Sequence, residues 1–111
     1  MLLADRWTIV VLSVNNAGER VDYLARVRDA LLAHGFEGWT ESPSYGYWRG
    51  TGEEGTTITL YVPAPAEADY GDARSEVFER LTTIAKDSQP DQLSIFISCD
   101  PAATLYAGKV T

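Results

Sequence analysis

Residues 45–62 constrain the fold of this chain more than any other stretch. Their second half alternates strictly, because Ile58, Leu60 and Val62 are separated by threonine and tyrosine, all residues that favour strands. Successive side chains of a strand point to opposite faces, so the aliphatic set is predicted to face a core. Pro63 follows and lacks the N–H group that a sheet requires. The pattern predicts a strand that ends at this proline.

The first half of the same stretch is aromatic and predicts the partner arm of a hairpin. Tyr45, Tyr47 and Trp48 are strand formers, and Pro43 interrupts the pattern before them. We therefore expect a bulge or bend at residues 42–44. Three glycines surround two glutamates at residues 50–55, and glycine adopts positive φ angles without steric cost. This Gly-rich segment is predicted to form the hairpin tip.

Composition limits the class of protein and its partners. The 111 residues fit one domain, with a core at about residues 7–99 and a tail at 100–111. A net charge of −7 with nine Lys plus Arg disfavours nucleic acid and anionic membranes as partners. The single cysteine, Cys99, cannot form an intramolecular disulfide, which suits a reducing cytoplasm. The apolar run at residues 7–12 follows no basic segment and is short for a signal peptide or a membrane span.

The remaining segments predict two helices and two further strands. Residues 7–14 are nearly all apolar, as in a central strand. Asn16 and Glu19 have capping-box spacing, so the first helix is predicted to start there and run to about His34, with Gly35 as its C-terminal cap. The second helix is expected at residues 70–87, and its apolar face includes Phe78.

The last strand is expected at residues 92–99, where Leu93, Ile95 and Ile97 alternate with polar or aromatic neighbours. Asp100 and Pro101 then predict a turn. A short extra strand is expected at residues 104–107. These positions complete the order strand, helix, strand, strand, helix, strand.

This order predicts an α+β, ferredoxin-like βαββαβ fold. Right-handed crossovers place both helices on one face of a four-stranded antiparallel sheet, with the first and third strands central. Ile58, Leu60, Val62 and the aliphatic residues of the last strand should face the helices.

The second face of such a sheet is predicted to be too apolar to remain bare in water. A large exposed apolar patch marks an interface or a ligand site. We expect a homo-oligomer, a trimer or a dimer, with Thr59, Tyr61, Phe96 and Trp48 in the interface. A ligand platform on this face and a cover formed by the chain's own tail are the alternatives.

The chain resembles the PII/CutA-type group of trimeric ferredoxin-like proteins. The resemblance lies in Tyr47-Trp48-Arg49-Gly50, in Glu53-Glu54 and in the alternating strand 57–62, and the order of elements matches over residues 7–99. It implies the fold and trimer formation. The chain lacks the Cys and His of the copper-linked members near the first helix, and the basic residues that hold nucleotide phosphates. The resemblance therefore implies neither metal nor ATP binding.

Catalytic motifs do not stand out. Glu53 and Glu54 could act as paired carboxylates, but neighbouring residues on a hairpin tip are seldom held rigidly enough for acid–base work. His34 is the single histidine and has no nearby Cys or His, so a metal site is not predicted. No cofactor is expected. Whether the chain is an enzyme stays open, with a non-enzymatic role favoured.

The sequence favours a cytoplasmic regulatory or binding module that self-associates through its open sheet face. The hairpin would contact a protein partner or a small ligand, through residues Tyr45, Tyr47, Trp48, Arg49, Gly50 and Gly52. One alternative is a small acidic inhibitor or decoy, such as a virus-encoded protein, that binds a basic or nucleic-acid-binding host factor. A small enzyme that uses the open sheet face is another.

Overall fold

The computed structural model describes residues 2–65, 70–92 and 94–106. Its elements follow the predicted order of strand, helix, strand, strand, helix, strand. They are β1 (Leu2–Leu12), α1 (Tyr23–Ala33), β2 (Thr40–Trp48), β3 (Thr51–Pro63), α2 (Tyr70–Ser88) and β4 (Ile97–Tyr106).

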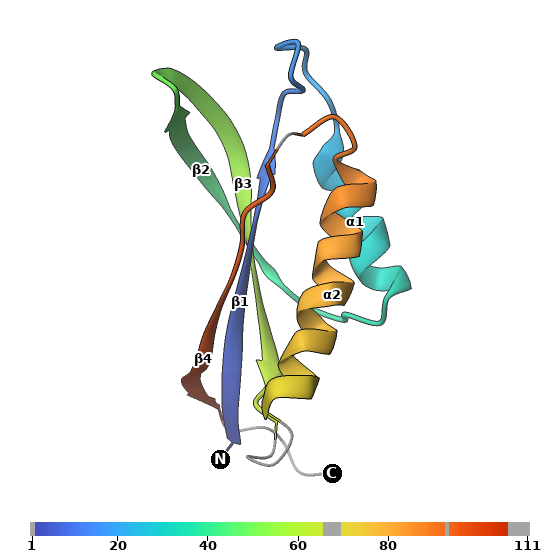
Figure 1. Ribbon diagram of the computed structural model, residues 1–111, viewed down its shortest axis with the longest axis vertical. Helices are drawn as coiled ribbons and strands as arrows, with labels where there is room; N and C mark the ends of the chain where they lie inside the picture. The colour runs from blue at the N-terminus through green and yellow to red at the C-terminus, as the bar shows by residue number, and fades with distance from the viewer. Residues whose placement is uncertain (1, 66–69, 93, 107–111) are drawn as a thin grey trace.

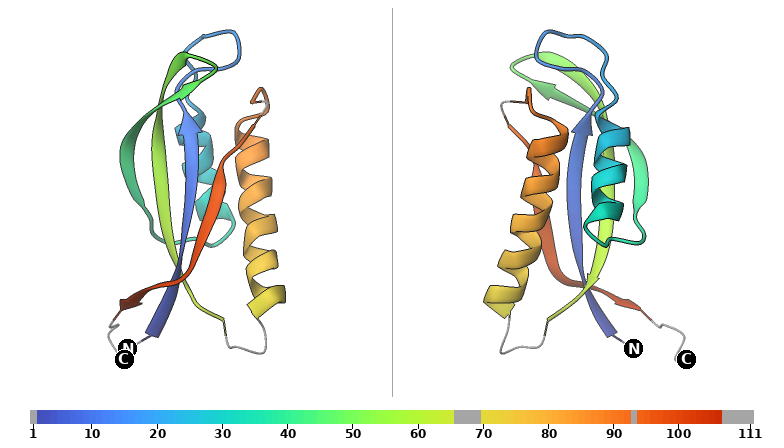
Figure 2. Two further views of the ribbon diagram at one scale, coloured as in Figure 1. Left: turned by 60° about the vertical axis from the view of Figure 1, so that its left-hand side comes forward. Right: turned by 90° about the vertical axis from the view of Figure 1, so that its right-hand side faces the viewer.

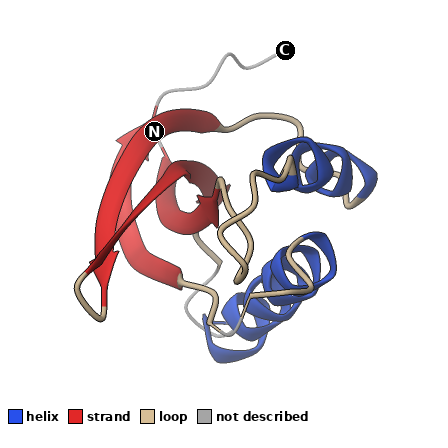
Figure 3. Ribbon diagram, turned by 90° about the horizontal axis from the view of Figure 1, so that it is seen from above, coloured by secondary structure: helices blue, strands red, loops and turns tan. Residues whose placement is uncertain are grey.

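The four strands form one antiparallel sheet in the order β2-β3-β1-β4. As predicted, the first and third strands are central. Both helices lie on the same side of the strongly twisted sheet, and the other side has no helix over it (Figure 1, Figure 3). This is an α+β architecture compatible with the ferredoxin-like fold.

The core lies between the sheet and the two helices. Alternate residues of the central strands point into it, as the strand patterns predict, and every fourth residue of α1 meets them. Ile58 and Leu60 are fully buried, while Val62, Ile95 and Ile97 are partly buried against the same cluster. Leu93, which is predicted to join them, lies outside the described residues. The buried cluster comprises Trp7, Ile9, Val11, Tyr23, Val27, Leu31, Ile58, Leu60, Leu81, Ile84 and Ala85.

The first helix begins later than the capping-box spacing predicts. Its N-cap is Asp22, whose carboxylate accepts a hydrogen bond from the Ala25 N–H group. The carbonyl oxygen of the Asn15 side chain instead accepts from the N–H groups of Ala17 and Glu19, at 3.0 and 2.9 Å. This local bonding holds the segment before the helix in a loop. The helix ends as predicted, because Gly35 has a φ of 87°.

The hairpin turns at a different place from the predicted tip. Trp48 pairs with Thr51, so Arg49 and Gly50 alone form the turn, with φ angles of 50° and 79°. Two positive φ angles in a two-residue loop are those of a type I′ turn. The rest of the Gly-rich segment belongs to β3. The predicted bulge at residues 42–44 is wrong, because the pairing from Thr40 to Trp48 has no register shift.

The last strand starts later and runs further than predicted. Asp100 and Pro101 lie within β4, where the pairing with β1 shifts register between Ala4 and Arg6. The predicted turn is thus an irregularity of one continuous strand. Residues 104–106 extend this strand along the start of β1, and 107 lies outside the described residues. The second helix matches its prediction closely, but Phe78 is 47% exposed and does not belong to the buried cluster.

Candidate functional site

The β2–β3 hairpin carries aromatic side chains on both of its faces. Tyr45 and Tyr47 lie on the helix side in an edge-to-face contact, with ring centroids 5.4 Å apart, and are 62% and 75% exposed. Trp48 has the opposite parity and lies on the open side of the sheet, 55% exposed. The Arg49 guanidinium lies 5.6 Å from the centre of its ring. The predicted binding residues are therefore close in the chain but divided between two faces.

The two glycines of the predicted site shape the hairpin. Gly50 supplies a positive φ to the turn. Gly52 lies opposite Tyr47, and the Tyr45 ring lies over it where a larger residue's Cβ would be. Both glycines therefore have a geometric reason for their place in the hairpin, apart from any ligand.

The hairpin end and the loop between β1 and α1 project together beyond the ends of both helices (Figure 1, Figure 2). The Arg20 guanidinium crosses from this loop to the Glu54 carboxylate on β3, at 3.3 Å. The Ser13 N–H group also donates to the Glu54 carbonyl oxygen, at 3.0 Å. These contacts hold the loop beneath β3.

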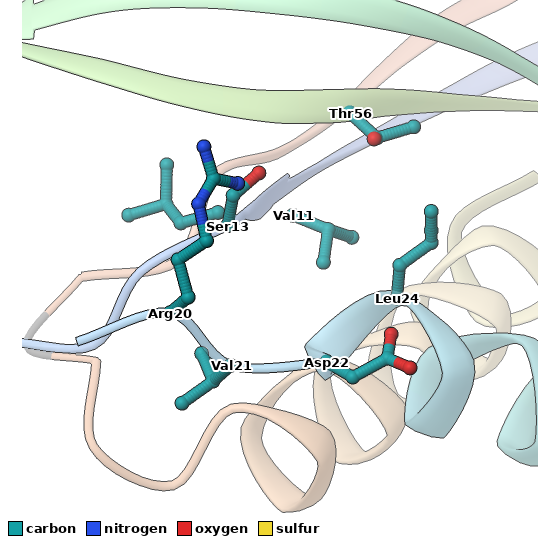
Figure 4. A pocket seen from close by; sticks show the side chains of 8 residues that line it. Val11, Ser13, Arg20, Val21, Asp22, Leu24 and Thr56 are labelled. Carbon is teal, nitrogen blue, oxygen red and sulfur yellow. The ribbon is translucent and has the colours of Figure 1, made fainter.

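A hollow of about 440 Å³ lies where this loop meets β3 and the start of α1 (Figure 4). Arg20 extends from the loop at one side, and Leu24 and Thr56 border the other (Figure 4). Sequence reasoning missed this hollow, because the loop, the start of α1 and the distant strand β3 come together only in the folded chain. It is lined by Val11, Leu12, Ser13, Arg20, Val21, Asp22, Leu24 and Thr56.

The open sheet face is more polar than the sequence predicts. Cross-strand pairing places Thr8 beside Thr59 and Ser98, so small hydroxyl side chains occupy the middle. Tyr61 and Phe96 are 53% and 59% exposed. By register they share this face with Trp48 and Thr59, so the four predicted interface residues lie on one side of the sheet.

An ion pair crosses the same face near its end. The Arg6 guanidinium donates from Nη2 and Nε to the Asp100 Oδ2 atom, at 2.7 and 3.1 Å. This bonding raises the pKa of Arg6 above its ordinary value. Both side chains are about half exposed, so the pair contributes little to stability. It adds polar character next to Tyr61.

Trp39 is partly buried against the core cluster and helps to fix the start of β2. The Glu41 carboxylate accepts hydrogen bonds from Arg28 Nε at 2.8 Å and from Trp39 Nε1 at 2.9 Å. Arg28 also donates from Nη2, which makes the contact bidentate. The Arg28 bonds first, and the Trp39 bond second, lower the pKa of Glu41 to about 2. This cluster joins α1 to the edge strand.

The groups considered for catalysis are not brought together. Glu53 and Glu54 are neighbours in β3, so their side chains point to opposite faces. His34 is exposed at the end of α1. Burial, with a smaller effect of Asp5, raises the pKa of the Cys99 thiol, the reverse of what a nucleophile needs. Among the described residues, no three His, Cys, Asp or Glu side chains are grouped closely enough to hold a metal ion.

Neither the models of known protein families nor the sequences of curated proteins match this chain. The resemblance to PII/CutA-type proteins therefore stays a prediction. Within the described parts of the chain, no helix has the length and apolar character needed to cross a membrane.

Proposed function

We propose that this chain is a non-enzymatic binding module of ferredoxin-like fold that self-associates through its open sheet face. The observation that carries the proposal is the common placement of three exposed aromatic residues, Trp48, Tyr61 and Phe96, on the sheet face opposite the helices. Exposed aromatic residues on one surface are typical of interfaces. The neighbouring Thr59 and Thr57 side chains present methyl groups that can pack against a second sheet face.

The length of the hairpin supports the same proposal. The protein extends 47 Å along its long axis, against 27 and 24 Å along the others. The hairpin end lies beyond the helices, so Trp48 is free to lie across a neighbouring subunit (Figure 2). The predicted dimer or trimer would then combine contacts of the sheet face with contacts of the arm. The single cysteine keeps the cytoplasm as the proposed location.

The helix side of the hairpin is the proposed contact for a partner or small ligand. Tyr45 and Tyr47 point to this side and remain exposed, and Glu54 on the same side is held by Arg20. Two rigid aromatic rings with few rotatable bonds lose little entropy on binding. This contact is separate from the self-association face and can act while the oligomer is formed.

Net charge gives little support to the acidic-decoy alternative. Four of the carboxylates, Asp5, Glu41, Glu54 and Asp100, are paired with arginines of the same chain. These four carboxylates are therefore already engaged within the protein and are less open to a basic partner. The remaining negative charge also serves solubility.

A double substitution on the open sheet face, with a control substitution on a helix, tests the self-association. Tyr61→Ser with Phe96→Ser should lower the sedimentation coefficient to that of a single chain, because both side chains would be buried in the oligomer. Leu32→Ser is the matched control, since Leu32 is 59% exposed, like Phe96, but lies on α1. An unchanged coefficient in the double variant, or an equal change in the control, would contradict the proposal. Far-UV circular dichroism verifies that each variant is folded.

A further inference from the structure

A second hollow lies along the flank of α2, away from the hairpin and the open sheet face. Its volume is about 610 Å³, within the range of small-molecule sites. One wall is α2, and the other is the segment that leads into β4. It is lined by Phe78, Thr82, Lys86, Gln89, Pro90, Gln92, Ile95 and Ile97.

The α2 wall is formed by residues on one side of the helix, and Gln89, which follows the last residue of α2, extends it. Phe78, Thr82 and Lys86 are spaced by four residues, so they project from the same side of the helix. Two turns separate Phe78 from Lys86, about 12 Å along the axis. Ile95 and Ile97 supply apolar surface opposite. The hollow is therefore elongated, with an aromatic residue toward one end and a cation toward the other.

Two buried polar atoms of the lining have no hydrogen-bond partner in the part of the chain that the structure describes. The Gln89 side chain is only 2% exposed, and its Oε1 atom accepts a hydrogen bond from the Leu12 N–H group at 3.4 Å. Its Nε2 atom has no hydrogen-bond partner among the described residues, and neither does the Thr82 hydroxyl oxygen. Buried donors without acceptors are rare and costly. The neighbouring Gln92 differs, because its Nε2 atom donates to the Val14 carbonyl oxygen at 3.0 Å.

The charge of the lining differs from that of the whole protein. The chain carries a net charge of −7, yet the described residues that line this hollow include no aspartate or glutamate. Lys86 is the cation of the lining and belongs to none of the ion pairs in the described part of the chain. The lining thus offers one positive charge, two unpartnered polar groups and an apolar wall.

We propose that this hollow binds a medium-chain carboxylate or a similar linear amphiphile with an anionic head. The head group would pair with Lys86 and accept hydrogen bonds from Gln89 Nε2 and the Thr82 hydroxyl. The hydrocarbon chain would lie against Phe78, Ile95 and Ile97. This site is independent of the proposed self-association, because its lining residues lie on the helix side of the sheet.

Three probes with the same hydrocarbon chain test the proposal: octanoate, 1-octanol and octylamine. Isothermal titration calorimetry with the full chain should show saturable binding of octanoate and about tenfold weaker binding of 1-octanol, because a charge-assisted bond is lost. Octylamine should not bind, since Lys86 repels it. No saturable binding of octanoate, or equal affinity for all three probes, would overturn the proposal.

Two substitutions in the lining and one control substitution outside it locate the site. Lys86→Met should weaken octanoate binding about tenfold, whereas Arg26→Met, which removes an exposed cation from α1, should leave it unchanged. Thr82→Val should weaken binding and also raise the melting temperature, because it removes a buried hydroxyl without a partner. Octanoate should shift the methyl NMR signals of Ile97 and not those of Ile58. Binding that survives Lys86→Met, or shifts centred on Ile58, would place the ligand elsewhere and refute this site.

Discussion

Gly55 lies where the backbone of β3 packs tightly against the backbone of β1. A Cβ atom at this position would collide with the backbone carbonyl oxygen of Val11, which cannot rotate away as a side chain does. We expect Gly55→Ala to lower the free energy of unfolding by about 1–3 kcal/mol. Gly46→Ala on the neighbouring strand is the control, because a Cβ there meets open space. Urea denaturation measures the free energy of unfolding of both variants. An equal decrease in the two would show that the close contact with Val11 does not require glycine at position 55.

Asp5 joins three elements through one buried carboxylate. It is 1% exposed, accepts hydrogen bonds from Arg74 Nε and Nη2 at 2.8 Å, and accepts one from the Ala102 N–H group at 2.7 Å. Asp5→Asn should destabilise the protein by about 3 kcal/mol or more, because a buried ion pair loses one charge. Asp100→Asn should cost about 1 kcal/mol or less, since its pair with Arg6 is half exposed.

The stabilisation that the Asp5 carboxylate provides should depend on pH. The hydrogen bonds from Arg74, the largest effect, lower the pKa of Asp5 from its ordinary 3.8 and outweigh the opposing effect of burial. The stabilisation is therefore complete above about pH 3.8 and is lost as the pH falls through the lowered pKa. Denaturation of the wild type and Asp5→Asn at neutral and acid pH should show a difference that shrinks in acid. A constant difference would contradict this role.

At the scale of elements, the contact between α1 and the edge strand β2 depends on Glu41. Its pKa is lowered from 4.5 to about 2, so its contribution to stability is complete above pH 4.5 and disappears as the pH falls to about 2. Glu41→Gln should remove this part of the acid sensitivity, as measured by urea denaturation between these pH values. Glu37→Gln is the control, because Glu37 is exposed and has no hydrogen bond in the described part of the chain. If both variants retain the wild-type acid sensitivity, Glu41 does not stabilise this contact.

The elements also show what the sequence can and cannot predict. Their order, the central strands and the end of α1 at Gly35 follow from periodicity and one glycine. The hairpin tip could not be placed from the sequence, because glycine occurs both in turns and where another group packs closely against the backbone. Gly50 forms the turn, whereas Gly52 and Gly55 leave room for Tyr45 and Val11. The start of α1 was ambiguous for a similar reason, since Asn and Asp cap helices and also stabilise loops.

At the scale of the whole molecule, the two hollows could not be predicted at all. Arg20 and Thr56 line the first hollow, and Thr82 and Ile97 line the second, only because segments apart in the sequence pack together. Trp48 and Tyr47 point to different faces, as neighbouring residues of a strand do. What the open face contacts in solution is a property of more than one chain, and it stays a proposal.

A substitution of Trp48 tests whether the end of the β2–β3 hairpin contacts a neighbouring subunit. If it lies across a neighbouring subunit, Trp48→Ala should weaken self-association by about 2 kcal/mol or more and leave the protomer folded. Tyr47→Ala is the control, because Tyr47 is more exposed but points to the helix side. Sedimentation equilibrium measures the association, and far-UV circular dichroism the fold. An unaffected oligomer, or a collapsed fold, would show that the arm does not act as proposed.

The mass of the wild-type protein in solution tests the central claim most directly. Light scattering over a range of micromolar concentrations should give two or three times the 12.2 kDa of one chain, falling toward that value on dilution. A mass of 12.2 kDa at every concentration would contradict self-association through the open sheet face.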